Sequence, residues 1–412
     1  MVKIYSIQDD RERYIPISLD SLVPGTQIPF EIFTYDDTIF KSLLDKGSTY
    51  SFFAKEMIEK QAVSSFYIRQ GNTLSFDEYM HNAARLKEMI LDPDFFEEKY
   101  REFRDRWFII DKQILNCGMP FTIPLGGLRF PLFGEIPFGV DGAASYRHLL
   151  DLNSDIAVRK KDIGPYYVYL DTILDAPDIE DPVMKLRVRR EKLKVWCYRA
   201  LEEIRNNAVS QDTLLKLYKH ISLNKAMIAN NFSIAGKLLF LDVSDTFLYV
   251  HSTNVCILSM MHGHMLNLPE TDLLNLGISA LFHDAGLTTI DDDASVDSQD
   301  EMKRDIFKSH VLRGKELLER YDEIPRVAIT VALTHHERED GSGYLYGLTG
   351  DRIHRYSKIV GLADTFESLR VSGYKQKTIK RTQVLGQMVR DGQTFDPEMF
   401  RIFLQFVAAL SL

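Results

Sequence analysis

Cysteine is scarce in this chain of 412 residues, which contains only Cys117, Cys197 and Cys256. Three scattered thiols are too few for a disulfide framework or a thiolate metal site, so we expect a reducing compartment. The N-terminus has no apolar core followed by a small-residue cleavage site, and no later run reaches about 18 uninterrupted apolar residues. The sequence therefore predicts a cytoplasmic protein with no membrane span.

A surplus of positive charge is also missing. The formal net charge at pH 7 is −9, and no basic arm or tail is present. We therefore expect no nucleic-acid polymer as a partner, although a small anion could still bind in a locally positive pocket. Hydrophobic residues make up 45% and charged residues 26% of the chain, which is close to the globular average and argues against disorder. The length predicts two or three domains.

The first part of the chain is predicted to mix strands and helices. The apolar pattern predicts strands at 3–7, 14–19, 28–33 and 65–68 and helices at 40–44 and 53–60. Residues 1–75 are therefore predicted to form a small α/β domain. Residues 76–180 are predicted to form a middle region of helices and short strands, with helix-forming sequence at 76–115 and a strand at 166–170. A sensory role, or the binding of a protein partner, is our hypothesis for this N-terminal region.

A second region begins after the acidic, proline-containing stretch at 175–182, which has the composition of a linker. Residues 181–225 are predicted to form a connecting helix, and residues 226–412 show helical spacing with few strand signals. The predicted fold is multidomain, with a C-terminal all-α helical bundle preceded by a mixed α/β region. A basic run opens the connecting helix, and we expect it on a solvated face, with a patch for nucleic acid or an acidic partner as the alternative. This run consists of Lys185, Arg187, Arg189, Arg190, Lys192 and Lys194.

Histidine and aspartate recur on the inner faces of the predicted bundle. His251 lies on a helix face that is otherwise apolar, and His283 with Asp284 ends the apolar run 280–282. A satisfied core histidine or a helix cap explains any one such position better than a metal. Five helices that each bring imidazole or carboxylate inward are harder to explain by packing, because a buried charge is costly unless it is paired or metal-bound. The set is His251, His283, Asp284, His310, His335, His336 and Asp364.

The chemistry of this set predicts a metal centre. Neutral imidazole suits first-row transition metals, and an aspartate can bridge two ions. Seven nitrogen and oxygen ligands exceed the need of a single ion, so we expect two ions, of Fe, Mn or Zn rather than Mg or Ca. Two ions about 3.5–4 Å apart would lower the pKa of a bridging water and hold a phosphoryl group. The sequence therefore predicts phosphoester hydrolysis.

The motifs carry a more specific resemblance. The segment HHEREDGSGY at 335–344 resembles the signature HHE-x-x-DG-x-GYP of the HD-GYP branch of the HD phosphohydrolase superfamily. His283-Asp284-x-Gly286 resembles the HD-x-G-K motif, and ADTFESL at 363–369 resembles AD-x-FD-x-L. The resemblance covers roughly residues 225–410, and characterised members of the family hydrolyse cyclic di-GMP.

The resemblance implies roles for the residues that match. It implies two metal ions, Fe or Mn foremost, held by the seven residues above, with Asp284 as the bridge and with His283, His335 and His336 as further catalytic residues. Some members recruit a third ion through a glutamate one turn before the first ligand, and Phe247 stands there in this chain. We therefore expect two ions.

Several positions depart from the family pattern where substrate is contacted. Leu287 replaces the lysine after HD-x-G, Leu345 replaces the GYP proline, and the R-P-Y-R stretch is Ser-Gly-Tyr-Lys at 372–375. Lysine and glutamate stand where the following helix usually has arginine and a second aspartate. The predicted substrate contacts are Tyr344, Lys358, Glu367 and Lys375.

Three functions stay open at this point. The first is a phosphodiesterase that hydrolyses a cyclic dinucleotide, cyclic di-GMP. The second is a weak or inactive relative that binds a nucleotide or a protein partner, which the lost lysine and arginine favour. The third is a hydrolase of a different phosphoester. An acidic run at 291–293 is predicted to be a solvated loop, but beside the pocket it would repel a dinucleotide. The oligomeric state also stays open, with a homodimer as one option.

Overall fold

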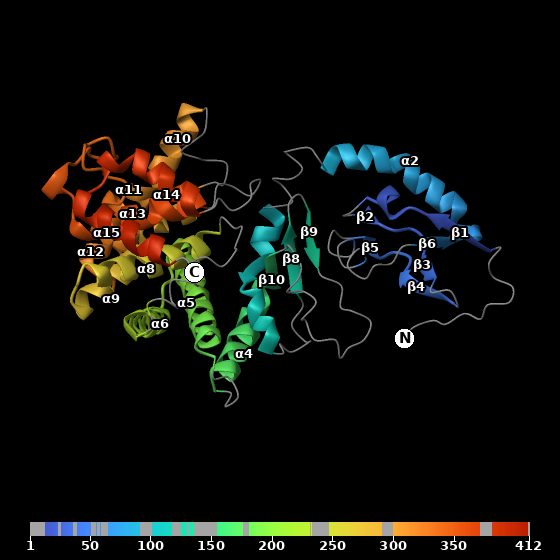
Figure 1. The fold of residues 1–412 in the computed structure, drawn as a ribbon, viewed down its shortest axis with the longest axis horizontal. Helices are drawn as coiled ribbons and strands as arrows, with labels where there is room; N and C mark the ends of the chain where they lie inside the picture. The colour runs from blue at the N-terminus through green and yellow to red at the C-terminus, as the bar shows by residue number, and fades with distance from the viewer. Residues whose placement is uncertain are drawn as a thin grey trace. The chain divides into compact units, whose positions relative to one another are not determined.

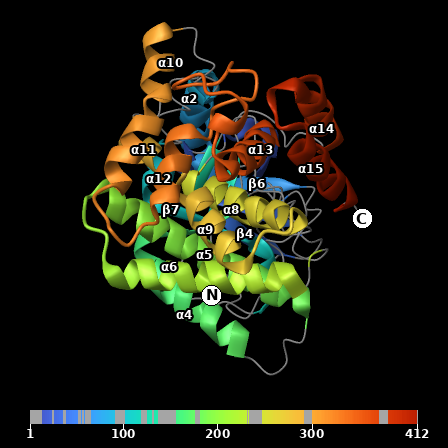
Figure 2. The ribbon, with the colours of Figure 1, turned by 90° about the vertical axis from the view of Figure 1, so that its left-hand side faces the viewer.

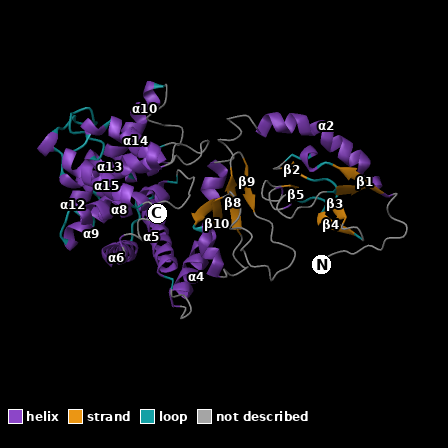
Figure 3. Cartoon of the chain, in the orientation of Figure 1, coloured by secondary structure: helices purple, strands orange, loops and turns teal. Residues whose placement is uncertain are grey.

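The chain divides into two compact units, Met1–Tyr169 and Leu170–Leu412, which are described separately. Strands lie in the first unit, and the described part of the second unit contains helices and loops (Figure 3). A predicted all-α bundle after a mixed α/β region is thereby confirmed as the fold class. The computed structural model describes residues 13–23, 26–35, 39–50, 55, 58, 65–90, 101–117, 125–129, 132–135, 155–175, 181–230, 232, 247–290, 300–370 and 381–410.

One sheet of the first unit is built from antiparallel strands in the order β1-β6-β3-β4 (Figure 1). These strands are β1 (Tyr14–Ile17), β3 (Ile32–Tyr35), β4 (Phe40–Leu44) and β6 (Phe66–Arg69), and β2 (Thr26–Gln27) pairs with β5 (Thr49–Tyr50). The short helices η2 (Leu19–Ser21) and η3 (Gln70–Asn72) precede helix α2 (Thr73–Ile90). Tyr79 of α2 packs edge-on against Phe30, so the helix closes an apolar core.

A second antiparallel sheet of this unit has the order β7-β10-β8-β9. Its strands are β7 (Trp107–Ile110), β8 (Leu125–Arg129), β9 (Leu132–Glu135) and β10 (Asp155–Arg159), with η4 (Lys112–Cys117), η6 (Lys160–Asp162) and α4 (Ile163–Asp175) beside them in sequence. All four residues of β7 are buried. Tyr169 of α4 donates a hydrogen bond to the Ile114 carbonyl, which fastens the helix to this core.

Two predicted elements of the first unit are wrong, and the helix-forming stretch expected at 76–115 is wrong in part, because residues 107–110 pair with β10 and form strand β7. Residues 40–44 were expected to be helical and form β4, because pairing with β3 decides a five-residue segment whose own period is ambiguous. Residues 166–170, an expected strand, lie in α4, where buried Ile163, Tyr166, Leu170 and Ile173 follow helical spacing. The expected strand at 3–7 and most of the expected helix at 53–60 lie outside the described residues.

The second unit is a bundle of helices, with α8 among the others (Figure 2). Helix α8 is buried along most of its length. Helices α5, α6, α9, α13 and α15 all pack on α8. The helices are α5 (Pro182–Arg205), α6 (Gln211–Asn230), α8 (Leu248–Met265), α9 (Glu270–Phe282), α10 (Glu301–Lys308), α11 (His310–Leu318), α12 (Arg326–Thr334), α13 (Arg355–Arg370), α14 (Arg381–Arg390) and α15 (Pro397–Ala409), with η7 (Ala285–Thr289), η8 (Gly350–Arg352) and η9 (Gly392–Thr394).

Helices α5 and α6 belong to this bundle, although residues 181–225 were expected to connect two domains. Helix α5 begins at Pro182 with Asp181 as its N-cap, and it packs on α6, α8 and η7. The expected solvated basic face is wrong for Arg190, Lys192 and Lys194, which are all buried. Their charges are balanced within the bundle, since Lys194 pairs with the buried Glu191 and Lys192 with Asp171.

The described helices include none that combines the length and the apolar character needed to cross a bilayer.

Candidate metal centre

The histidines and aspartates predicted from the sequence come from five segments of the helical unit. His251 lies on α8 and Asp364 on α13, while His283 and Asp284 follow the end of α9. His310 begins α11, and His335 with His336 follows α12. The structure brings all seven side chains together, as expected.

A glycine makes the approach of two of these segments possible. Gly286 of η7 lies so near the start of α11 that a Cβ atom there would be 1.9 Å from the carbonyl oxygen of His310 and 2.6 Å from the nitrogen of Gly314. Only a residue without a side chain fits this contact. The contact holds Asp284, two residues earlier, against the imidazole of His310.

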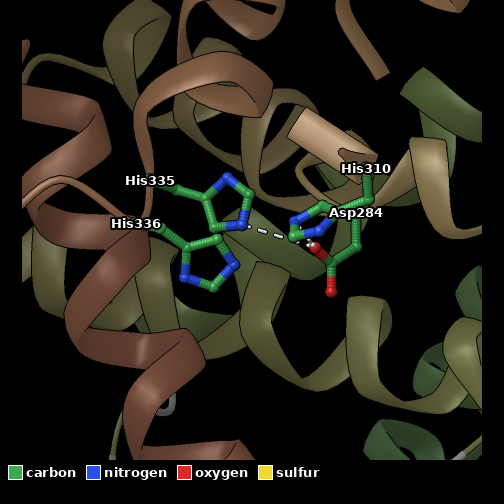
Figure 4. A group of neighbouring side chains, drawn as sticks. All are labelled: Asp284, His310, His335 and His336. Atoms are coloured by element: carbon green, nitrogen blue, oxygen red, sulfur yellow. Dashed lines mark ion pairs between the residues drawn. The ribbon is translucent and has the colours of Figure 1, made fainter. Parts of the chain in front are cut away.

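The ligand atoms form two groups that share Asp284. In one group, Oδ1 of Asp284 lies 3.2 Å from Nε2 of His310 and 3.3 Å from Nε2 of His335. Figure 4 shows these imidazoles turned toward the carboxylate, with His336 beside them. In the other group, Oδ2 of Asp284 lies 3.3 Å from Nε2 of His283. The two oxygens of one carboxylate thus face two different sets of ligands.

The second group is completed by His251 and Asp364. Nε2 of His251 lies 3.3 Å from Oδ1 of Asp364 and 3.3 Å from Nε2 of His283. Oδ2 of Asp364 points the other way and lies 3.8 Å from Nδ1 of His336. Within each group all candidate ligand atoms lie within 4.8 Å of one another, which suits a single ion in each.

Backbone carbonyls fix which nitrogen of three imidazoles carries the proton. Nδ1 of His283 lies 2.7 Å from the Ala280 carbonyl oxygen, and Nδ1 of His310 lies 2.7 Å from that of Phe307. Nδ1 of His335 has the same kind of partner in the carbonyl of Val331, at 3.1 Å. A carbonyl can only accept, so Nδ1 donates and Nε2 of the neutral ring keeps a lone pair. The lone pairs of all three rings converge on Asp284.

The close approach of imidazoles and carboxylates shifts the pKa values of both kinds of group. Burial raises the pKa of Asp284, but the imidazoles of His283, His310 and His335 outweigh it and hold that pKa well below its usual range. Burial lowers the pKa of His310, but the carboxylate of Asp284 outweighs it and raises the pKa above the ordinary value. For His336, burial and the neighbouring His335 hold the pKa well below its ordinary value. The carboxylates are therefore charged and attract a cation.

The residues fit a metal centre on this evidence. Nε2 of His310, Nε2 of His335 and Oδ1 of Asp284 are buried, and none has a hydrogen-bond partner among the described residues. Buried polar atoms of this kind are rare in proteins unless an ion or a water satisfies them. The donor set is nitrogen and oxygen without thiolate, and the Nδ1 hydrogen bonds of His283, His310 and His335 are the usual support of a metal-bound histidine.

Tyr344 lies against this centre. Its ring stacks on the imidazole of His336 with centroids 4.6 Å apart, and Nζ of Lys308 lies over the same ring at 5.6 Å. The Tyr344 hydroxyl is buried and has no hydrogen-bond partner within the part of the chain that the structure describes. Glu337 shapes the loop, because its carboxylate accepts hydrogen bonds from the backbone nitrogens of Tyr346 and Leu348.

Lys358 and Glu367, two further expected substrate contacts, have partners among the described residues. The ammonium of Lys358 lies 2.7 Å from Glu339 and 3.5 Å from Asp396, so two carboxylates already neutralise it. Glu367 is buried, and both of its oxygens accept hydrogen bonds from Arg370. Both side chains thus have charged partners within the bundle, and their role as substrate contacts stays a prediction. Lys375 and the acidic run at 291–293 lie outside the described residues.

Sequence reasoning missed four residues near the centre. Lys308 stands two positions before His310 and was not considered because its helix looked like an ordinary charged surface. Asn254 and Arg370 lie three positions after His251 and Glu367, a spacing that places each on the same helix face as that neighbour. Arg190 belongs to a basic run, and only packing shows that it is buried.

Comparison with known proteins gives consistent matches for this unit. An HD domain family model matches residues 239–399. The cyclic di-GMP phosphodiesterase PA4108 of Pseudomonas aeruginosa is 26% identical over 172 residues, which cover 41% of this chain and 42% of that protein. The cyclic di-GMP phosphodiesterase response regulator RpfG of Xanthomonas campestris is 32% identical over 154 residues, which cover 36% of this chain and 40% of that protein.

A solved structure aligns over a longer stretch. The HDG"Y"P protein Bd1817 from Bdellovibrio bacteriovorus aligns with 96% of this chain and 99% of its own, at 12% identity and a TM-score of 0.48. The chain spans about two fifths of the length of the two curated relatives that it matches. The family model falls on the helical unit that carries the centre. Residues 239–399 of the chain are therefore an HD domain.

Proposed function

We propose that this protein is a metal-dependent phosphodiesterase that hydrolyses a cyclic dinucleotide, with cyclic di-GMP as the expected substrate. The observation that carries the proposal is one carboxylate, Asp284, whose two oxygens face two separate groups of ligand atoms. Relatives of the HD domain are named as cyclic di-GMP phosphodiesterases, and another, from Vibrio cholerae, is named 3'3'-cGAMP-specific phosphodiesterase 2. These names support the substrate class.

The proposed ions are Fe or Mn, one in each group. His310, His335 and His336 would hold one ion, and His251, His283 and Asp364 the other, with Asp284 shared. When bound, the pair would lower the pKa of a shared water and hold the phosphoryl group, which is the chemistry that phosphodiester hydrolysis needs. His283, Asp284, His335 and His336 are the proposed catalytic residues.

Residues of the chain itself would orient the substrate. The unpartnered hydroxyl of Tyr344 can donate a hydrogen bond to a phosphate oxygen. The ammonium of Lys308 supplies positive charge next to it, and no carboxylate among the described residues forms an ion pair with this lysine. Because His336 already covers one face of the Tyr344 ring, a hydrogen bond suits this residue better than stacking on a base.

The test is metal quantification after anaerobic purification, followed by incubation with cyclic di-GMP or 3'3'-cGAMP and chromatography of the products. Two histidines of α8 provide matched variants, one at a proposed metal ligand and one at a histidine of the apolar core. His251 lies in the centre, whereas His262 is buried near the other end of the helix and hydrogen-bonds the Met399 carbonyl. We expect about two ions per wild-type chain, loss of one ion and of turnover in His251→Gln, and both retained in His262→Gln.

The outcomes separate the functions that remained open. Turnover of cyclic di-GMP that disappears in Asp284→Asn supports the proposal. Two ions without turnover of either dinucleotide would favour a ligand-binding module or a different phosphoester, which the leucine at position 287 already favours. A metal-free wild-type protein would contradict the ligand assignment. For the N-terminal unit, a sensory or protein-binding role is proposed, which a comparison of full-length and truncated protein tests.

A further inference from the structure

A chain of buried hydrogen bonds joins three helices beneath the metal centre. Arg190 of α5 donates from Nη2 to Oδ1 of Asn254 on α8, at 2.6 Å. Asn254 donates in turn from Nδ2 to Oε1 of Glu367 on α13. Arg370 closes the chain with donors to both oxygens of Glu367, each at 3.0 Å. We name these four residues the α5–α8–α13 network.

The network is almost completely shielded from solvent. Its four residues are between 1% and 3% exposed. Burial raises the pKa of Glu367, but the guanidinium of Arg370 outweighs it and holds that pKa below its usual value, so the carboxylate is charged. Buried charged groups of this kind tolerate little movement, because a displaced partner leaves an uncompensated charge in an apolar interior.

The network lies one helical turn from two of the candidate ligands. Asn254 stands three residues after His251 on α8, and Glu367 stands three residues after Asp364 on α13. Residues at this spacing share a helix face. The hydrogen bond between Asn254 and Glu367 therefore fixes the rotation of both helices at the turn next to the ligands. His251 and Asp364 are themselves in contact, at 3.3 Å between Nε2 and Oδ1.

The other half of the centre has different support. His310 and His335 lie on α11 and after α12, and their Nδ1 atoms are held by carbonyls of their own segments. The hydrogen bonds that define the network join only α5, α8 and α13. Nδ1 of His283 is held in the same way, so the network's particular contribution is to His251 and Asp364, which lie on two of the helices that it joins.

We propose that Arg190 is a positioning residue for the half of the centre formed by His251, His283 and Asp364. It acts through Asn254 and Glu367, and it does not contact the ion or the substrate. The proposal rests on the proposed function, since it assumes that both groups bind metal. It gives α5, which precedes the matched HD domain at 239–399, an indirect part in metal binding.

The test is the variant Arg190→Met, with Lys192→Met as the matched control. Both substitutions remove a buried cation of α5, but Lys192 pairs with Asp171, whereas Arg190 donates to Asn254 of the network. Apo protein is titrated with Mn²⁺, and bound metal is measured by equilibrium dialysis and by electron paramagnetic resonance. We expect one site in Arg190→Met to weaken about 10–100-fold, the effect typical of lost outer-shell support, while the other site keeps its affinity. The signal of coupled ions should give way to that of a single ion.

A second variant covers the case that methionine prevents folding. Arg190→Lys keeps the buried positive charge but has a single donor group in place of the planar fork. We expect it to fold and to weaken the same single site by a smaller factor. Unchanged affinity at both sites in folded Arg190 variants, or equal weakening of both sites, would overturn the proposal.

Failure of this inference can be told apart from failure of the proposed function. If wild-type protein binds no Mn²⁺, both fall. If wild-type protein and both Arg190 variants bind two ions equally well, the metal centre stands and the positioning role is refuted. If Lys192→Met weakens one site as strongly as Arg190→Met does, the effect belongs to α5 packing in general, and the network is not its cause.

Discussion

Two lysines near the centre differ in what surrounds them. The ammonium of Lys308 lies over the Tyr344 ring, beside the ligand His336. The ammonium of Lys358 is neutralised by Glu339 and Asp396, which leaves it little to offer a phosphate. Position 287, where the family pattern has a cation, is leucine. Lys308 is therefore our candidate for the charge that an anionic substrate requires.

Lys308→Met is expected to raise KM for a cyclic dinucleotide by about 10-fold and to change kcat less. A hydrogen bond to a charged group contributes about 1.5–3 kcal/mol, and about 1.4 kcal/mol corresponds to a tenfold change in binding. Steady-state kinetics at fixed ionic strength measures the effect. In Lys358→Met, by contrast, KM should stay within about twofold of wild type, and a larger rise there than in Lys308→Met would refute this distinction.

His262 gives a pH dependence that is independent of metal binding. It is fully buried against Phe403 and Phe406, Nε2 bonds the Met399 carbonyl, and Nδ1 has no partner within the described residues. Burial lowers its pKa to about 4. A second proton would be taken up more readily by the unfolded chain, whose histidine has a pKa of about 6.5.

The stability that His262 contributes is therefore complete above about pH 6.5 and is lost as the pH falls toward 4. The loss amounts to about 3 kcal/mol at most, at about 1.4 kcal/mol per pKa unit. Urea unfolding of the wild type and of His262→Gln, both with a chelator, should show a shallower pH dependence in the variant. Parallel curves would mean that His262 does not titrate between these limits.

At the scale of elements, glycines decide how near the ligand segments approach. A Cβ atom at Gly286 would overlap the His310 carbonyl, and one at Gly361 of α13 would lie 2.5 Å from the carbonyl oxygen of His335. Both contacts are between backbones, which cannot rotate away as a side chain can. The glycines therefore hold η7 against α11 and α13 against the end of α12.

Gly286→Ala is expected to lower the free energy of unfolding by about 3 kcal/mol, because overpacking forces η7 and α11 apart. It should also weaken metal binding, since Asp284 and His310 separate. Gly386 of α14 is the control, because nothing lies within 4 Å of a Cβ atom there. Gly386→Ala should stabilise by up to about 1 kcal/mol through helix propensity. Chemical denaturation measures both, and equal effects would contradict the backbone argument.

The packing of elements also explains why the secondary structure predicted at 40–44 and at 166–170 was wrong. Residues 40–44 form strand β4 because they pair with β3. A segment of five residues is too short for its apolar spacing to distinguish a helix from a strand. Residues 166–170 are rich in aromatic and β-branched side chains, yet the buried positions Ile163, Tyr166, Leu170 and Ile173 trace one helix face. A longer window would have found that helix.

At the scale of the whole molecule, the unit that carries the candidate metal centre is larger than the matched HD domain. Helices α5 and α6 pack on α8 and α9, and Asp171 pairs with Lys192. A chain starting at 239 lacks these helices and leaves the apolar surfaces that they cover in contact with water. The compact unit Leu170–Leu412 includes α5 and α6.

A chain of residues 170–412 is therefore expected to fold and to bind about two ions, whereas residues 239–412 should aggregate or bind fewer. Circular dichroism, light scattering and metal analysis of the two chains give the comparison. Equal folding and metal content would show that α5 and α6 are dispensable. That result would also weaken the role assigned to Arg190.

The sequence by itself determined the helical bundle and the candidate ligand set, because apolar spacing predicts the helices and the motifs place imidazole and carboxylate at their ends and inner faces. Only the tertiary structure decided which charges reach the centre. It paired Lys358 and Glu367 with other side chains, buried Arg190 under α8 and brought Lys308 to Tyr344. The physical reason is that a charged residue has no intrinsic preference for one partner, and the packing of distant helices selects it.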